Sequence, residues 1–221
     1  REHEAVRRDV EYTQQRLRLR LLERQEQLMR IARDISNRDI DVAEFQVRAE
    51  ALVIQYPDLE RLSWIDQNLR VRATYATASL QPGAASQPGE QLAPEETRNN
   101  FKLAQETLQP IYAQRAASGA AVPLLQLHIP MNDGTRFVGV VLAEYSVDGL
   151  YRALGQDGHG AEQPGLEAEH GVVVDEVAAV VRQGRGAEAA ARGTRGAADA
   201  EGRHHQQGDP GQQHREGQGS A

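Results

Sequence analysis

The first apolar pattern along the chain is a heptad repeat. Residues 3–36 contain no Gly or Pro, and apolar side chains recur there at alternating three- and four-residue spacings. The seam consists of Val10, Gln14, Leu17, Leu21, Arg24, Leu28, Ile31 and Ile35. This pattern predicts one long helix. Two interpretations stay open: the seam pairs with a second copy of the chain in a dimer, or the helix lies along its own domain.

A second helix is predicted from Asp41 onward. Asp41 is a good capping residue, and Glu44 follows it at the spacing of a capping box. Pro57 ends the helical pattern, because proline removes a backbone donor and clashes with the preceding turn. The apolar face of this helix consists of Phe45, Ala49 and Leu52.

After Pro57 the apolar period changes to two, which predicts strands. Leu59–Asp66 and Leu69–Thr77 read as a hairpin around Gln67 and Asn68. On the second strand, alternation places one set of side chains on one face, namely Leu69, Val71, Ala73 and Tyr75. The opposite face then carries Arg70, Arg72 and Thr74.

The remaining pattern predicts a helix, three strands and a last helix. The helix begins at Pro94-Glu95-Glu96, where proline and acidic residues suit a first turn. The strands are Ile111–Gln114, Val122–Met131 and Arg136–Tyr145, and Asn132-Asp-Gly134 gives a hairpin turn between the last two. Arg136–Tyr145 is the most apolar strand, so we expect it at the centre of the sheet. Ser146 caps a helix over residues 147–155.

This order predicts an α+β fold: a long N-terminal helix at 1–36, then a PAS-like five-stranded antiparallel sheet with helices packed on it, over residues 37–155. Residues 156–221 differ in composition, since they hold 13 of the 20 glycines, and Leu166 is their only Leu, Ile, Met, Phe, Tyr or Trp. Such a segment cannot bury enough apolar surface to offset its chain entropy. We predict either a disordered tail or an out-of-frame translation of GC-rich DNA, in keeping with 24 Arg against one Lys.

Composition and charge exclude several classes of function. The absence of cysteine removes disulfides, thiolate metal sites and thiol nucleophiles. A formal net charge of −7 argues against a nucleic-acid partner, which would require a basic face. No apolar run reaches the roughly 20 residues that span a bilayer. Because the chain starts at Arg1 without a signal-peptide pattern, we expect it to be a fragment of a longer protein.

No catalytic or metal motif is convincing, so we expect no enzyme activity, catalytic residue, metal or cofactor. Gly184-Arg-Gly186-Ala-Glu-Ala189 imitates a dinucleotide-binding fingerprint, but no second apolar strand follows to complete the unit. His204, His205 and His214 lie in the glycine-rich tail, where we interpret them as no metal site.

The chain resembles the extracytoplasmic PAS-like (Cache-type) sensor domains of bacterial transmembrane receptors, most closely those of sensor histidine kinases. The resemblance covers about residues 1–154 and rests on patterns of hydrophobicity and turns. Besides the long N-terminal helix, the segments that carry it are Tyr56–Asp66 leading into Leu69–Ala73, Pro110-Ile-Tyr112, Leu125–Pro130 and Phe137–Ser146. The family implies a membrane helix before Arg1, a further module or membrane helix after the domain, and a periplasmic domain held at the inner membrane.

A PAS-like sheet can hold a small ligand between its face and an adjoining helix. We expect Arg72 and His128 to hold a carboxylate through charge-assisted hydrogen bonds, with Tyr112, Tyr145 and Arg136 near the pocket. The alternative is that both arginines are solvated, His128 is an ordinary sheet residue and the tyrosines belong to the core.

The predicted function is therefore signal input: a truncated receptor domain that binds a small molecule, dimerises through its N-terminal helix and belongs to a two-component histidine kinase. The alternatives are the sensor region of a diguanylate cyclase, or a coiled-coil interaction module that senses nothing.

Overall fold

The computed structural model describes residues 2–78, 87–93, 95–115, 124–156 and 179, with the side chains of 2–10 and 154–156 left aside. The predicted tail over residues 156–221 therefore lies outside the described residues, apart from positions 156 and 179. In chain order the elements are α1 Glu2–Ser36, α2 Val42–Gln55, β1 Leu59–Asp66, β2 Val71–Ala76, α3 Glu95–Thr107, β3 Ile111–Arg115, β4 Leu124–Asp133, β5 Arg136–Ser146 and α4 Val147–Gln156.

The five strands form one antiparallel sheet in the order β2-β1-β5-β4-β3. The predicted α+β, PAS-like arrangement is thus confirmed for the described residues. The most apolar strand, β5, occupies the centre, as its composition predicts. Two hairpins, β1–β2 and β4–β5, are joined through the α3 segment and β3.

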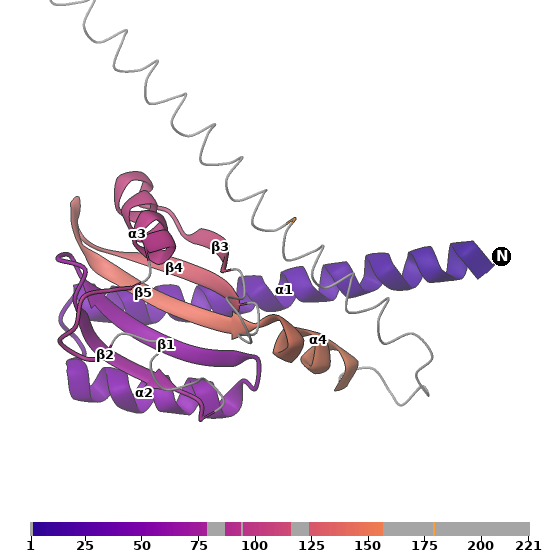
Figure 1. The fold of residues 1–221 in the computed structure, drawn as a ribbon, viewed down its shortest axis with the longest axis horizontal. Coiled ribbons are helices and arrows are strands. Elements are labelled where there is room, and N and C mark those ends of the chain that lie inside the picture. The colour runs from indigo at the N-terminus through magenta and orange to yellow at the C-terminus, as the bar shows by residue number, and fades with distance from the viewer. Residues whose placement is uncertain (1, 79–86, 94, 116–123, 157–178, 180–221) are drawn as a thin grey trace, which may run out of the picture.

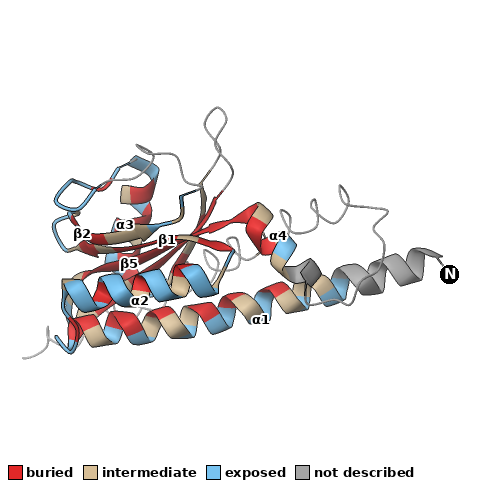
Figure 2. Cartoon of the chain, turned by 90° about the horizontal axis from the view of Figure 1, so that it is seen from below, coloured by how far each residue is buried: buried red, intermediate tan, exposed pale blue. Residues whose placement is uncertain are grey.

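The sheet separates two helical layers. The helices α1 and α2 pack side by side on one face, where α1 covers β4 and β5 and α2 covers β1 and β2 (Figures 1 and 2). The opposite face carries α3, which packs on β3, β4 and β5. We call these the α1/α2 face and the α3 face. At one end of the sheet, α4 continues from β5 and contacts α1.

The heptad seam of α1 is buried within its own chain. From Leu17 to Ile35 its side chains belong to the core of the α1/α2 face. Figure 2 shows this buried stripe along α1 facing the sheet. The structure thus favours the second interpretation of the pattern, in which the amphipathic helix lies on its own domain. The outward side of α1 carries three exposed apolar side chains, Tyr12, Leu19 and Leu22.

Both predicted helix caps are present. The side chain of Asp41 accepts a hydrogen bond of 2.9 Å from the backbone N–H of Glu44 at the start of α2. The Oγ of Ser146 accepts one of 3.0 Å from the backbone N–H of Gly149 at the start of α4. The reciprocal half of the capping box is replaced, because the Glu44 carboxylate accepts a hydrogen bond from Arg48 instead.

Simple alternation fails on β2, where the prediction for its apolar side chains was wrong. Val71 belongs to the core of the α3 face, whereas Ala73 belongs to that of the α1/α2 face. The cause is an irregular register with β1, in which Ile65 pairs with Val71 but the preceding Trp64 pairs with Ala73. A β-bulge of this kind inserts one residue, here Arg72, and reverses the side-chain pattern beyond it.

Candidate functional site

The candidate site is a group of buried polar side chains on the α3 face. Arg61 lies directly opposite Glu144 in the register of β1 and β5, and Gln126 lies opposite Glu144 in that of β4 and β5. Opposite side chains in antiparallel strands point to the same face. Three neighbouring strands therefore bring these groups together beneath α3. Arg61 is 5% exposed and Glu144 is 2% exposed.

Hydrogen bonds link this group to α3. The Nη1 of Arg61 donates to Oε2 of Glu144 at 2.9 Å. The amide of Gln126 donates to Oε1 of Glu144 at 2.9 Å and is 3.2 Å from the hydroxyl of Thr97. Thr97 belongs to the first turn of α3 and is buried. We refer to Arg61, Thr97, Arg115, Gln126 and Glu144 as the polar cluster.

Positive charge exceeds negative charge within the polar cluster. The Nη1 of Arg115, at the end of β3, is 3.8 Å from Oε1 of Glu144, so two guanidinium groups share one carboxylate. Burial lowers the pKa of Arg61, and Glu144 opposes that change. The guanidinium nevertheless keeps its proton, because arginine is effectively always charged in proteins. The cluster therefore presents a buried charge excess that suits an anion.

Such a cluster contributes little to stability. Removing two charges from water costs several kcal/mol for each ion, and the attraction between them often does no more than offset that cost. Charged groups buried in this way are more frequent at functional sites. A small cavity of about 20 Å³ lies against the cluster, and Leu92, Val71 and Leu142 line its apolar side. In this conformation the cavity has room for about one water molecule.

His128 lies on the same face of the sheet. It pairs with Ile111 and Leu142, both part of the core beneath α3. Its side chain is 0% exposed, and neither imidazole nitrogen has a hydrogen-bond partner in the described part of the chain. Burial lowers the pKa of His128 to about 3. The imidazole is therefore neutral at pH 7, and it supplies no positive charge for a carboxylate.

The two predicted tyrosines lie on the other side of the sheet. Tyr112 and Tyr145 belong to the α1/α2 face, and Tyr145 is completely buried. The hydroxyl of Tyr112 donates to Oε1 of Gln25 on α1 at 3.0 Å. Burial raises the pKa of both phenols, and the neighbouring Tyr112 and Asp58 raise that of Tyr145 further. Both groups thus stay protonated at pH 7.

The two predicted arginines lie at a third place. Arg72 and Arg136 line an open hollow of about 410 Å³ at the C-terminal end of α1, beside Trp64. Arg72 lies 3.9 Å from Asp66 and Arg136 lies 3.5 Å from Asp133, with both arginine side chains more than half exposed. The structure therefore brings Arg72 close to Arg136 but not to His128, since the sheet separates them. The expected carboxylate clamp of Arg72 with His128 is not formed.

The central pair of the polar cluster, Arg61 with Glu144, was missed by the sequence analysis. One signal was present: Glu144 is a charged residue inside the most apolar strand of the chain. A buried strand carries a charge only where that charge has a partner. The identity of the partner follows from the β1–β5 register, which the pattern does not contain. Among the described residues no group of three or more histidines or acidic residues is placed to hold a metal ion.

Comparison with known proteins gives a fold but no sequence relative. No protein-family model matches the sequence, and no curated protein matches it. The solved structures that are similar in fold include three ligand-binding domains of chemoreceptors. One is that of the Pseudomonas aeruginosa PAO1 amino acid chemoreceptor PctB in complex with L-Arg, with 15% identity and a TM-score of 0.51, where the match covers 73% of this chain and 60% of that chain. Another is that of PctC from the same organism in complex with GABA, with 13% identity, a TM-score of 0.51 and coverage of 70% of this chain and 68% of that chain. The third is that of Pseudomonas fluorescens CtaA in complex with L-alanine, with 14% identity, a TM-score of 0.50 and coverage of 69% of this chain and 63% of that chain.

The match therefore spans about three fifths of the PctB domain rather than all of it. At this level of identity the likeness concerns the fold alone. It confirms the fold implied by the resemblance: the described residues form a PAS-like domain of the kind found in chemoreceptor ligand-binding domains.

Proposed function

We propose that the domain is the ligand-sensing input domain of a membrane-bound signal-transduction receptor, and that its ligand binds between α3 and the sheet. The observation that carries this proposal is the buried Arg61–Glu144 pair at 2.9 Å, with a second guanidinium from Arg115 beside it. A cluster of this kind costs stability and offers charge complementarity to a small polar ligand. The structurally similar domains are ligand-binding domains of chemoreceptors, which supports this proposal.

The chemistry of the polar cluster favours a ligand with both a carboxylate and an ammonium group. Arg61 and Arg115 can hold a carboxylate by charge-assisted hydrogen bonds, and Glu144 can accept from an ammonium group. The structurally similar domains were solved with L-Arg, GABA and L-alanine, which all carry these two groups. We therefore propose an amino acid or a related compound as the ligand of this site.

Binding at the polar cluster requires α3 to move away from the sheet, because the cavity has room for only about one water molecule. The apolar contacts of α3 are few: Phe101 and Ala104 are its members of the buried core. An element with a small buried surface is displaced more easily than one with a large surface. A ligand that binds the open arrangement better than the closed one would shift this equilibrium, and that shift is the signal.

The receptor context is also part of the proposal. We propose that flanking helices anchor the domain at the inner membrane, that the domain lies in the periplasm, and that the output module is a histidine kinase, with a diguanylate cyclase as the alternative. Within the described residues, no helix combines the length and apolar character needed to cross a bilayer.

We further propose that a second copy pairs along the outward side of α1, since the heptad seam is occupied by the sheet. The exposed side chains there, Leu19 at 61% and Leu22 at 55%, lie three residues apart on one helix face. Replacing both with glutamate should lower self-association in analytical ultracentrifugation, without changing the thermal midpoint of unfolding by more than a few degrees. Unchanged association would rule out this surface.

The sensing proposal is tested by a thermal-shift screen of the full chain with L-amino acids, GABA and simple carboxylates. A ligand that binds only the folded protein raises the midpoint in proportion to the logarithm of its concentration. We expect at least one compound with both groups to do so, and we expect its response to become smaller in Arg61→Met/Glu144→Gln. An unchanged response in that variant would place the ligand elsewhere, and a screen without any response would contradict the function.

A further inference from the structure

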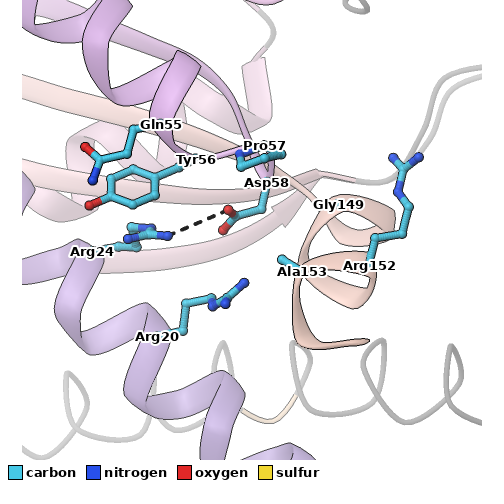
Figure 3. A pocket seen from close by; sticks show the side chains of 9 residues that line it. All are labelled: Arg20, Arg24, Gln55, Tyr56, Pro57, Asp58, Gly149, Arg152 and Ala153. Atoms are coloured by element: carbon cyan, nitrogen blue, oxygen red, sulfur yellow. Dashed lines mark ion pairs between the residues drawn. The ribbon is translucent and has the colours of Figure 1, made fainter. Parts of the chain in front are cut away.

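A second hollow lies at the corner where α1, the start of β1 and α4 meet. Its volume is about 470 Å³, within the range of small-molecule sites. Figure 3 shows Arg20 and Arg24 reaching into this corner from α1, with Asp58 between them and α4. We call this place the α1/α4 hollow. It shares no lining residue with the polar cluster.

Asp58 is buried in the α1/α4 hollow without full hydrogen bonding. Its side chain is 1% exposed, and neither carboxylate oxygen accepts a hydrogen bond from any described residue. Its ion-pair partner is Arg24, whose Nη2 lies 3.8 Å from Oδ1. A buried carboxylate can accept several hydrogen bonds, and leaving them unmade is costly. The geometry therefore leaves a place for a donor next to Asp58.

Arg24 contacts Tyr56 as well as Asp58. The Cζ atom of Arg24 lies 3.1 Å from the centre of the Tyr56 ring, so the guanidinium is stacked on an aromatic face (Figure 3). Stacking fixes the plane of the guanidinium and leaves its N–H groups available at the edge. The Nε of Arg24 is buried and has no hydrogen-bond partner among the described residues. A planar anion could accept hydrogen bonds at this edge.

The lining of the hollow carries a net positive charge. Three arginines, Arg20, Arg24 and Arg152, accompany a single carboxylate, that of Asp58. Arg20 and Arg24 are one helical turn apart on the same side of α1 (Figure 3). An excess of guanidinium groups in a concave site favours a carboxylate or a similar anion. Asp58 adds a second requirement, namely a hydrogen-bond donor on the ligand, because its carboxylate repels an anion that has none.

We propose that the α1/α4 hollow binds a small carboxylate that carries a hydrogen-bond donor on the adjacent carbon, as 2-hydroxy acids and α-amino acids do. The carboxylate accepts from Arg20 and Arg24, and the hydroxyl or ammonium group donates to Asp58. This site is separate from the one under α3, and it does not depend on the proposed sensing role of the polar cluster. A ligand here bridges α1 and α4 and thereby fixes the position of α4.

The test uses three probes of nearly equal size: acetate, glycolate and glycine. They differ only in having no group, a hydroxyl or an ammonium group next to the carboxylate. Isothermal titration of the full chain should give glycolate or glycine an affinity at least about tenfold above that of acetate, as one added hydrogen bond to a charged group predicts. The preferred probe tells hydroxy acids from amino acids. Equal affinities for all three, or no binding, would overturn the proposal.

Variants separate this site from the polar cluster. Asp58→Asn should remove the advantage over acetate, and Arg20→Gln, at a partly exposed position, should weaken the binding of glycolate and glycine about tenfold. If Asp58→Asn does not fold, Arg20→Gln still tests the site. The Arg61→Met/Glu144→Gln protein is the control for glycolate, which lacks the ammonium group proposed for the α3 ligand, and it should bind glycolate unchanged. Loss of binding in that control, with normal binding in Arg20→Gln, would assign the probes to the α3 site and refute the α1/α4 site.

Discussion

The two faces of the sheet bury different kinds of side chain. The α1/α2 face carries a long, continuous apolar core to which both helices contribute, including Phe45, Leu21 and Leu28. The α3 face carries a shorter apolar core beside the polar cluster, and a single helix covers it. Both faces are buried, but the Arg61–Glu144 pair, the closest buried ion pair among the described residues, lies on the α3 face.

This difference separates stability from recognition. Apolar burial contributes about 25 cal/mol for each Å² removed from water, so the α1/α2 face holds the domain together. A buried ion pair contributes little net stability, and we propose that the pair on the α3 face recognises the ligand. We propose that the layer with the larger apolar core forms a platform against which α3 can move.

The largest effect is expected from a truncation on the α1/α2 face. Phe45 is 0% exposed and packs edge-to-face on Trp64, with ring centres 5.9 Å apart. Phe45→Ala should lower the free energy of unfolding by about 4 kcal/mol, because it removes a buried ring and leaves a cavity. Urea denaturation measures this loss. A loss below about 1 kcal/mol would mean that this face is not the main source of stability.

The next effect concerns the buried pair. Arg61→Met should cost about 3 kcal/mol of unfolding free energy, because it leaves the Glu144 carboxylate buried with less compensation. In the double variant Arg61→Met/Glu144→Gln most of that loss should be recovered, since no uncompensated charge of the pair remains.

Denaturation of the two single variants and the double variant gives the coupling energy between the positions. If the double variant is no more stable than Arg61→Met, the pair is needed for folding, and the assignment of the α3 face to recognition loses its basis.

A pH-dependent effect is expected from His128. In the unfolded chain its pKa is near the ordinary 6.5, whereas burial lowers it to about 3 in the folded domain. Between these values only the unfolded state binds the proton, so the stability of the domain falls as the pH is lowered from 6.5 towards 3.

His128→Leu removes the imidazole that binds this proton in the unfolded chain. The wild-type chain should lose about 2 kcal/mol more than the variant between pH 7 and pH 4.5. Denaturation of both proteins across this range measures the difference in unfolding free energy. The carboxylates are the same in both proteins, so their contribution to the pH dependence largely cancels. Parallel stability profiles would mean that the imidazole reaches solvent in the folded state.

The smallest effect is expected at the two exposed arginines. The ion pairs of Arg72 and Arg136 are long and exposed, at 3.9 Å and 3.5 Å. The double variant Arg72→Ala/Arg136→Ala should change the free energy of unfolding by less than about 0.5 kcal/mol. It should also leave the thermal-shift response of the α3 site unchanged. If the variant loses the response, the ligand binds in the hollow that Arg72 and Arg136 line and not at the α3 site.

The fold could be predicted further than the site. Element positions followed from periods of 3.6 and 2, and caps such as Asp41 are local in sequence, so they were predicted and are present. Strict alternation holds on β4, where Gln126 and His128 lie on the face opposite Leu127. The prediction failed on β2, because a bulge is a property of two paired strands and leaves no simple mark in one of them.

The candidate site depended on pairing between distant segments. Arg61 and Glu144 are 83 residues apart, and only the β1–β5 register places them within hydrogen-bond distance. Arg72 and His128 looked like partners because each is a polar residue in a strand. The sheet between them prevents any contact, and burial removes the charge of His128 at pH 7.

The sequence by itself determined the class of fold, the order of its elements and the central position of β5. These properties follow from hydrophobic periodicity and turn chemistry, which act over a few residues. The tertiary structure alone decided that the heptad seam of α1 lies on its own sheet, which charges are buried together, and where hollows remain. Those outcomes depend on which surfaces meet, and the free energy of a buried charge is set by neighbours that are distant in sequence.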